Sequence, residues 1–131
     1  MRITTASEMR ELDRISEQEY GIDAILLMEN AGRAAVQILL ETLPHAGDKT
    51  EILVFAGKGN NAGDAFVVAR RLISLDRRVR VFHLDNGSEY RGATLRNFEI
   101  LKKMKAKLSP VENIGELEEF FRTNGGPFTA V

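Results

Sequence analysis

The stretch Glu51–Leu75 constrains the fold more than any other part of the chain. It opens with a continuous apolar run, Ile52–Phe55, which is typical of a strand buried on both faces of a sheet. Gly57 and Gly59 interrupt the run, and from about Asp64 apolar residues recur at helical spacing. A strand, a glycine loop and a helix in this order form the first half of a βαβ unit, so the stretch predicts an α/β fold.

The flanking segments extend this prediction. Two amphipathic helices are expected before the strand, one from about Ser7 to Tyr20 with Gly21 as its stop, and one that begins near Asp23. Later elements are expected in the order strand, helix, short helix and strand, at residues 78–84, 92–108, from 114 and from 128. This alternation predicts a Rossmann-like three-layer αβα sandwich with a mainly parallel sheet and two helices preceding the first strand. We expect one domain over residues 1–131.

Apolar spacing also predicts which helix faces are buried. The expected face of the second helix consists of Leu27, Ala31, Ala35 and Ile38, and its small residues favour close packing on a neighbour. The helix expected over residues 92–108 has an apolar stripe at spacings of three and four that ends at Leu108.

Composition limits the classes of partner. A net charge of −1 gives no general attraction to nucleic acid or to an anionic membrane. The absence of cysteine excludes a disulfide framework, a thiolate zinc site and a cysteine nucleophile. No apolar run approaches the roughly 20 residues that cross a bilayer, and the charged start lacks a secretory signal. We therefore expect a cytoplasmic protein with neither a nucleic acid nor a membrane as partner.

The loop Gly57–Asp64 carries more polar chemistry than a tight turn requires. Its glycines let a ligand approach closely, and the helix N-terminus that follows favours an anion such as phosphate. Asn60 and Asn61 can donate and accept hydrogen bonds, and their oxygens suit a hard cation. For Asp64 alone the expected role is the helix N-cap. For the whole loop, at the carboxyl end of a buried strand, we expect a ligand site.

This loop and two further motifs resemble one known family. The sequence GNNAGD at residues 59–64 is similar to the GNNGGD signature of the YjeF N-terminal domain family, the NAD(P)HX epimerases. The stretches SEMRELD at residues 7–13 and LMENAGR at residues 27–33 match that family in the same order. The resemblance covers most of the chain, from about Ala6 to Val131, and is faint after Leu108.

The resemblance implies an isomerase, an NAD(P)H-hydrate epimerase, which interconverts the R and S forms of hydrated NADH and NADPH in cofactor repair. By analogy, the substrate-binding residues would be Asn60, Asn61, Ala62, Gly63 and Asp64. The position of Asn61 would also bind a potassium ion. The family further implies a homodimer and a functional partner, an NAD(P)HX dehydratase that accepts only one epimer.

Two departures from the family pattern bear on activity. Ala62 and Ala65 replace glycines, and each added methyl group would be costly if the backbone there needs positive φ. In the family, the strand that begins like Phe128–Val131 runs into a glycine-rich loop with the catalytic carboxylate and a second potassium ligand. We therefore expect a domain that is incomplete at its C-terminus, with weak or absent epimerase activity. Asp64 is then an alternative candidate for proton transfer.

Two other functions stay open. The pattern G-x-G-x-x-A at residues 57–62 satisfies a relaxed dinucleotide fingerprint, and Asp85 follows the next strand, as in the NAD-binding half of an oxidoreductase. The paired asparagines and the two leading helices argue against that alternative. The other is a non-catalytic dimerisation or scaffold module of the same fold, a use that the resembling family also contains. The retained polar side chains of the loop favour ligand binding over a pure scaffold.

Overall fold

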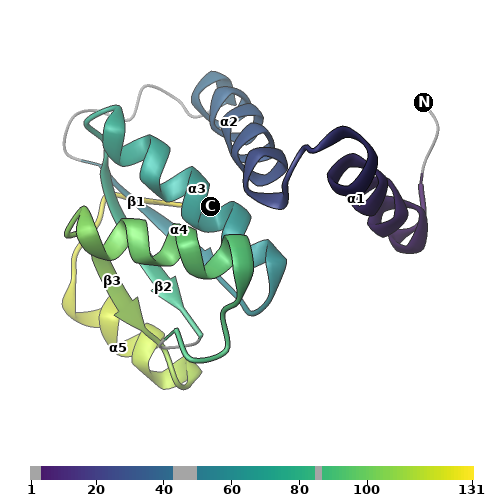
Figure 1. Ribbon diagram of the computed structural model, residues 1–131. Helices are drawn as coiled ribbons and strands as arrows, with labels where there is room; N and C mark the ends of the chain where they lie inside the picture. The colour runs from purple at the N-terminus through teal and green to yellow at the C-terminus, as the bar shows by residue number, and fades with distance from the viewer. Residues whose placement is uncertain (1–3, 43–49, 85–86) are drawn as a thin grey trace.

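A parallel sheet forms the centre of the molecule in the computed structural model, which describes residues 4–42, 50–84 and 87–131 (Figure 1). The strands are β1 (Glu51–Ala56), β2 (Arg78–His83), β3 (Lys107–Pro110) and β4 (Phe128–Ala130), in the spatial order β3-β2-β1-β4. All three neighbouring pairs are parallel. The helices α3 (Asn60–Ser74), α4 (Gly92–Lys103) and α5 (Ile114–Thr123) connect them. The predicted α/β architecture is confirmed.

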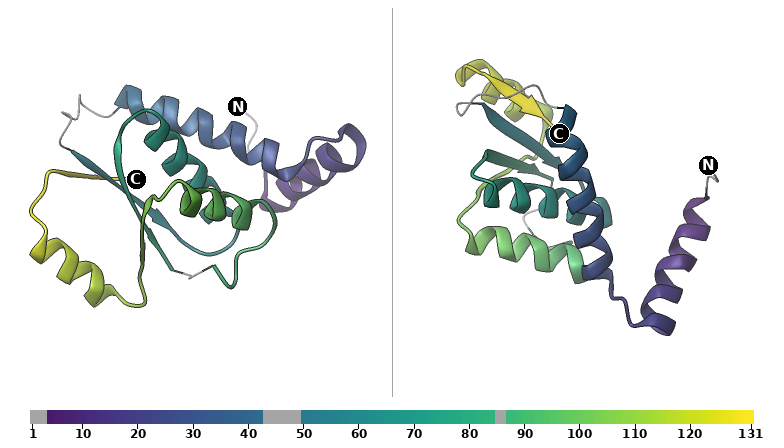
Figure 2. Two further views of the ribbon diagram at one scale, coloured as in Figure 1. Left: turned by 60° about the vertical axis from the view of Figure 1, so that its left-hand side comes forward. Right: turned by 90° about the horizontal axis from the view of Figure 1, so that it is seen from above.

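Helices cover both faces of the sheet. α3 and α4 lie on one face with α2 (Ala24–Thr42) beside α3, and α5 lies on the other face (Figures 1 and 2). The period-two alternation of β1 explains the two cores. Ile52 and Val54 belong to the larger core cluster, together with Phe66 of α3. Leu53 points to the opposite face and belongs to a smaller cluster, on which Phe120 of α5 packs.

The first helix, α1 (Ala6–Tyr20), projects away from this sandwich (Figure 2). Thr5 caps it in a capping box with Glu8, so the N-cap lies two residues before the predicted Ser7. Gly21 ends the helix at φ 67°, as predicted. None of the residues of α1, all of which are described, is buried. No helix within the described ranges is long and apolar enough to cross a membrane.

The start of α3 differs from the prediction. The helix begins at Asn60, so Asp64 lies one turn inside it and is not its N-cap. Gly59 occupies the cap position at φ 75°, a conformation that residues with a side chain rarely adopt. Ala62 and Ala65 lie within the helix, and the described non-glycine residues with positive φ are Asp76 and Lys105. The expected cost of the two alanines therefore does not arise.

The buried face of α2 also differs from the prediction. Its buried residues are Met28, Gly32 and Val36. Ala31 and Ala35 are exposed, and Ile38 is 61% exposed. The contact with α3 explains the rotation: a Cβ atom on Gly32 would lie 2.3 Å from Cγ1 of Val67, so the two helices approach most closely at the residue without a side chain. A prediction of the buried face from apolar side chains misses such a contact, because glycine has no side chain.

One strand was missed. Residues 92–108 were expected to form one helix, but α4 ends at Lys103 and β3 follows from Lys107. Lys105 turns the chain with a positive φ of 55°. Leu108 still packs against the larger core cluster, but from a strand. Because Leu108 is apolar and buried in either case, its spacing also matched the expected helix. With β3 present, the strand that begins at Phe128 is the fourth strand of the chain and not the third.

Candidate functional site

The glycine loop lies at the carboxyl edge of the sheet, between the end of β1 and the N-terminus of α3. This is the edge at which open α/β sheets bind their ligands. β4 ends at the same edge: Val131 accepts a hydrogen bond from the amide of Phe55, at 3.1 Å, and donates one to the carbonyl of Leu53, at 2.8 Å. Chain that follows β4 in a relative would therefore emerge close to this loop.

Three contacts from the segment before α4 and from its first turn hold the loop. The hydroxyl of Tyr90 donates to the carbonyl oxygen of Gly57 at 3.2 Å, and the hydroxyl of Thr94 donates to that of Gly59 at 3.4 Å. Lys58 forms an ion pair of 3.0 Å with Glu89, in which both side chains are more than half exposed. The two hydrogen bonds come from buried side chains, so the backbone of the loop is fixed before any ligand arrives.

Tyr90 is itself held by aromatic packing. Its side chain is 1% exposed, and its ring makes edge contacts with Phe66 and Phe98, each with centroids 5.2 Å apart. Phe66 belongs to α3 and Phe98 to α4. This cluster connects the loop to the larger core, which supports the preorganisation of the loop.

The five predicted site residues fall into two groups. Asn60 and Asn61 are exposed in the first turn of α3, and Asp64 is half-buried one turn later. Burial raises the pKa of the Asp64 carboxyl above its ordinary value. The structure thus brings three polar side chains together at one helix end beside two glycines.

The other two residues point inward. Ala62 is 0% exposed, belongs to the larger core and uses its amide in a 3.2 Å hydrogen bond to Gly59. A Cβ atom on Gly63 would lie 2.4 Å from Cε of Met28 and 2.8 Å from Oγ1 of Thr94. Gly63 therefore lies where α3 packs closely against both α2 and α4. Ala62 and Gly63 pack against the core on the inner side of α3 and so support the loop. Gly63 has no side chain and can contact a ligand only through its backbone.

A partly buried polar network between α2, α3 and α4 was not predicted. Glu29 of α2 bridges the guanidinium groups of Arg70 and Arg71 on α3. Arg70 also donates to Oδ1 of Asn97 at 3.3 Å, and Asn97 donates to Sδ of Met28 at 3.4 Å. The Met28-Glu29-Asn30 run of the LMENAGR motif was the available signal, but the partners of Met28 and Glu29 are 41 to 69 residues away in the chain.

The two arginines stabilise the charged form of the Glu29 carboxyl. Burial tends to raise the pKa of the Glu29 carboxyl, but Arg70 and Arg71 together outweigh it, so the pKa lies below its ordinary value. The contacts of this network tie α2 and α4 to α3, whose first turn carries the asparagines.

The groups that the loop offers to a cation are neutral oxygens. The described ranges contain no group of three His, Cys, Asp or Glu side chains that could hold a metal ion. The loop does present uncharged oxygens, namely those of the exposed side-chain amides of Asn60 and Asn61. The carbonyl oxygens of Gly57 and Gly59 already accept the hydrogen bonds described above. Such neutral oxygens are suitable ligands for a cation of low charge. Asp85, the candidate ribose contact of an oxidoreductase, lies outside the described residues.

Comparison with known proteins identifies the relatives of this arrangement. The family model described as YjeF-related protein N-terminus matches residues 8–124. A bifunctional NAD(P)H-hydrate repair enzyme Nnr from Moorella thermoacetica is 44% identical over 108 residues, which are 82% of this chain and 20% of that protein. An NAD(P)H-hydrate epimerase from Rhodopirellula baltica is 35% identical over 88 residues, which are 67% of this chain and 34% of that protein.

A solved structure has the same fold. The crystal structure of yeast ynu0, YNL200c, superposes with a TM-score of 0.75 at 25% identity and covers 92% of this chain. The chain spans about half, 51%, of the yeast chain and a smaller part of the two curated relatives above.

Proposed function

Because the chain belongs to the family of YjeF-related protein N-termini, we propose that it serves in the epimerisation of hydrated NADH and NADPH. The observation that carries the proposal is the anchored glycine loop at the carboxyl edge of the sheet, with Asn60 and Asn61 exposed beside it. The reaction class is isomerisation, and the two curated relatives are named for NAD(P)H-hydrate repair and epimerisation.

The loop would bind the dinucleotide part of the substrate. The amides in the first turn of α3 and the positive end of its dipole suit the pyrophosphate. Gly57 and Gly59 leave open space, since a Cβ atom on either would meet no atom within 4 Å. In this proposal Asn60 and Asn61 contact the substrate by their side chains, and Gly63 contacts it by its backbone. Ala62 is buried under the loop and supports the backbone that binds the substrate.

Asn61 would also hold the potassium ion, through its amide oxygen. A potassium ion there would offset part of the pyrophosphate charge. Asp64 is the proton-transfer candidate of the described residues in this loop, because burial raises the pKa of its carboxyl above the ordinary value.

The proposal includes two partners. An NAD(P)HX dehydratase would consume one epimer, which is in keeping with the word bifunctional in the name of the Moorella thermoacetica relative. A second copy of the chain would pack on the row Ala31, Ala35 and Ile38, which is exposed on α2. A cytoplasmic location is part of the proposal, because the substrate is a soluble cofactor.

A second candidate function, a non-catalytic dimerisation or scaffold module, is favoured by α1. This helix has no buried residue, and Met9 and Leu12 on it are 46% and 50% exposed. Such a module would use the helices and leave the loop unoccupied. No described residue favours the oxidoreductase alternative over these two.

A titration of the chain with an NAD(P)HX epimer mixture, followed by amide NMR, tests the proposal. We expect shifts at Gly57–Asp64 that are larger with NAD(P)HX than with NAD and larger in potassium than in sodium. Equal shifts with NAD that ignore the cation would favour a general dinucleotide site. A folded chain without shifts at the loop would contradict ligand binding and favour the scaffold module.

A further inference from the structure

Two hydroxyl groups hold carbonyl oxygens of the glycine loop from its inner side. The hydroxyl of Tyr90 donates to the carbonyl oxygen of Gly57 at 3.2 Å. The hydroxyl of Thr94 donates to the carbonyl oxygen of Gly59 at 3.4 Å. Tyr90 is 1% exposed and Thr94 is 2% exposed, so neither side chain reaches the open side of the loop. Any effect of these residues on a bound ligand therefore passes through the backbone.

The direction of each carbonyl group fixes the direction of the amide that follows it. In a trans peptide the C=O bond and the N–H bond of the next residue point in opposite directions. The cis bond recorded for the described residues lies outside the loop, so both peptides are trans. The carbonyl of Gly57 is held towards Tyr90 in the core, and the amide of Lys58 therefore points away from the core. In the same way, the inward carbonyl of Gly59 directs the amide of Asn60 outward.

The outer side of the loop is open. A Cβ atom on Gly57 or on Gly59 would meet no atom within 4 Å, and Lys58 and Asn60 are exposed. Asn60 is the first residue of α3, so its amide has no acceptor within its own helix. The two outward amides therefore face accessible space at the positive end of the α3 dipole.

The hydroxyl of Thr94 reaches the loop because Gly63 has no side chain. A Cβ atom on Gly63 would lie 2.8 Å from Oγ1 of Thr94, which is closer than real Cβ contacts come. The carbonyl oxygen of Gly59 also accepts the amide of Ala62 at 3.2 Å. Two donors on the inner side thus fix the peptide that joins Gly59 to Asn60.

Each hydroxyl also strengthens the amide that it directs. A hydrogen bond to a carbonyl oxygen polarises the peptide group, so its N–H becomes a stronger donor. At 3.2 and 3.4 Å the two bonds are long for hydroxyl donors, and hydrogen bonds at active sites commonly tighten when the substrate binds. Binding of an anion to the outward amides and tightening of the inward bonds should therefore support each other.

We propose that Tyr90 and Thr94 are positioning residues, which direct the amides of Lys58 and Asn60 towards the pyrophosphate of the hydrated dinucleotide. The inference rests on the proposed function of the loop and assigns the backbone donors within it. Pyrophosphate carries several acceptor oxygens, so two neighbouring N–H groups suit it better than one. In this arrangement neither hydroxyl touches the substrate or takes part in proton transfer.

Amide NMR with inorganic pyrophosphate, at constant ionic strength, tests the positioning role. In the unaltered chain we expect saturable shifts at the amides of Lys58 and Asn60. Thr94→Val removes the hydroxyl and keeps the branched shape, and it should weaken pyrophosphate binding about fivefold. Thr94→Ser keeps the hydroxyl and should bind pyrophosphate within about twofold of the unaltered chain.

The two Thr94 variants separate positioning from a general effect on stability. Thr94→Ser loses a buried methyl group, so the serine variant should be no more stable than Thr94→Val. We expect the order of pyrophosphate affinity to be the reverse, with the serine variant the tighter binder. Tyr90→Phe should also weaken binding, with the largest loss of shift at Lys58, whereas Thr94→Val should lose most at Asn60.

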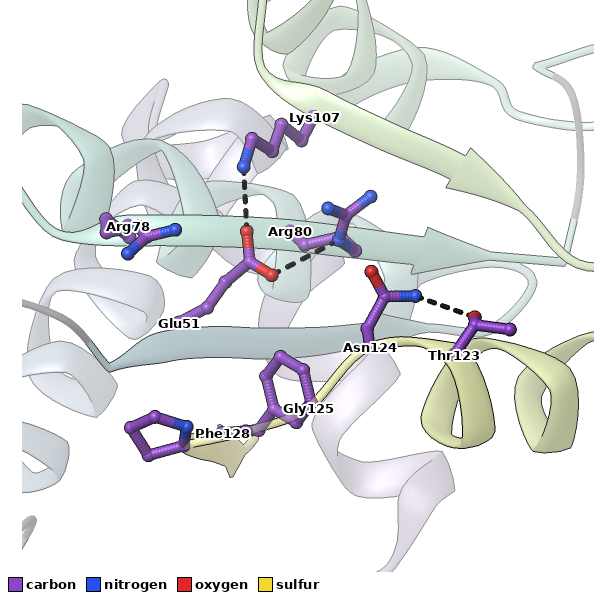
Figure 3. Close-up of a pocket in the computed structure, with 10 residues that line it drawn as sticks. Glu51, Arg78, Arg80, Lys107, Thr123, Asn124, Gly125 and Phe128 are labelled. Atoms are coloured by element: carbon purple, nitrogen blue, oxygen red, sulfur yellow. Dashed lines mark hydrogen bonds and ion pairs between the residues drawn. The ribbon is translucent and has the colours of Figure 1, made fainter.

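Thr123→Val is the matched control. The hydroxyl of Thr123 also donates to a backbone carbonyl, that of Glu119 at 2.8 Å. Thr123 lines a pocket at the opposite, amino-terminal edge of the sheet, away from the loop (Figure 3). This variant should bind pyrophosphate as the unaltered chain does. Equal affinity of the unaltered chain, Thr94→Val and Thr94→Ser would overturn the proposal.

Titration of the same variants with NAD(P)HX and with NAD distinguishes this proposal from the proposed function. If the unaltered chain prefers NAD(P)HX and Thr94→Val binds it equally well, the positioning role is overturned and the proposed function stands. If the chain binds NAD(P)HX and NAD equally, and Thr94→Val weakens both, the positioning role is supported and the proposed function fails. A folded chain without loop shifts for pyrophosphate or either dinucleotide contradicts both.

Discussion

The hydroxyl of Tyr90 donates a 3.2 Å hydrogen bond to the carbonyl oxygen of Gly57, joining the end of β1 to the segment that enters α4. The two residues are 33 positions apart in the chain. Because Tyr90 is 1% exposed and packs against Phe66 and Phe98, this bond ties the glycine loop to the core of the protein.

Tyr90→Phe should loosen the loop without disturbing the aromatic packing. The loss of one hydrogen bond is expected to lower the free energy of unfolding by roughly 1 kcal/mol. Amide hydrogen exchange at Gly57–Gly59 should become faster than in the unaltered chain. Tyr20→Phe is the control, since Tyr20 is 73% exposed. Unchanged exchange at the loop in Tyr90→Phe would show that the bond does not hold it.

Gly32→Ala should separate α2 from α3. The added methyl group would lie 2.3 Å from Cγ1 and 2.7 Å from Cβ of Val67, which is 0% exposed and cannot move aside. We expect a loss of about 1–3 kcal/mol in denaturant unfolding, despite the better helix propensity of alanine. Gly125→Ala, in open space, should change stability by less than about 0.5 kcal/mol. A stable Gly32→Ala variant would mean that the helices do not approach as described.

Asp64→Asn should stabilise the protein at neutral pH. Burial raises the pKa of Asp64 in the folded state above its ordinary value of 3.8. Between the two pKa values the folded state binds more protons than the unfolded state, so this group lowers stability as pH rises. The asparagine variant should therefore unfold at a higher temperature at pH 7. The gain should shrink as pH falls through the raised pKa and should be gone below about 3.8, where the carboxyl is protonated in both states.

The check is thermal unfolding of both chains from pH 3 to pH 7. Asp13→Asn, on the exposed face of α1, is the control and should follow the unaltered chain. An Asp64→Asn variant that is less stable at pH 7 would indicate a stabilising partner for this carboxylate.

Glu51→Gln should lower the free energy of unfolding at neutral pH, which is opposite to the effect expected for Asp64→Asn. Burial tends to raise the pKa of Glu51, but Lys107 and Arg80 outweigh it and hold the pKa below its ordinary value of 4.5. The stability from this carboxylate is then present above pH 4.5 and is lost as pH falls through the lowered pKa. Glu51→Gln should cost roughly 1–3 kcal/mol at pH 7 and less at low pH.

Chemical denaturation at pH 7 and at pH 3 measures this difference. Glu118→Gln serves as the control, because Glu118 is exposed on α5. An equal loss at both pH values would show that the cost comes from packing and not from the charge of Glu51.

Asn61→Ala should remove the dependence on potassium that the proposed function requires. Asn61 is exposed in the first turn of α3 and contributes no buried contact, so the fold should remain intact. We expect NAD(P)HX titrations of the variant to give the same shifts in potassium and in sodium. Gln37→Ala, which removes an exposed amide on α2, should keep the difference between the two cations. A cation effect that survives Asn61→Ala would place the ion elsewhere.

The local features of the chain were predictable because their signals are short-range. The apolar run of β1, the glycines that follow it and the periodicity of α3 lie within 25 residues, and together they predicted the βαβ unit. The stop at Gly21 was predictable for the same reason, since a glycine at φ 67° ends a helix by its own backbone geometry. The loop is predicted as a ligand site from its residue types and from its place at the carboxyl end of the strand.

The errors came from features that depend on the rest of the molecule. Asp64 was expected as the N-cap because of its side chain, whereas Gly59 sets the boundary by its positive φ. The face of α2 was misjudged because its closest contact is made by Gly32 against Val67. The strand β3 is four residues long, and it gains its hydrogen bonds only from β2.

The sequence by itself determined the order of helices and strands from β1 to α4, the glycine loop, and membership of a family that the three motifs mark. Only the tertiary structure decided which polar groups meet. Tyr90 reaches Gly57, and Lys107 reaches Glu51 from 56 residues away, because parallel register and helix packing bring distant positions together. Propensity and periodicity act over a few residues, whereas these contacts depend on how the layers pack. That packing anchors the glycine loop and brings Lys107 to Glu51.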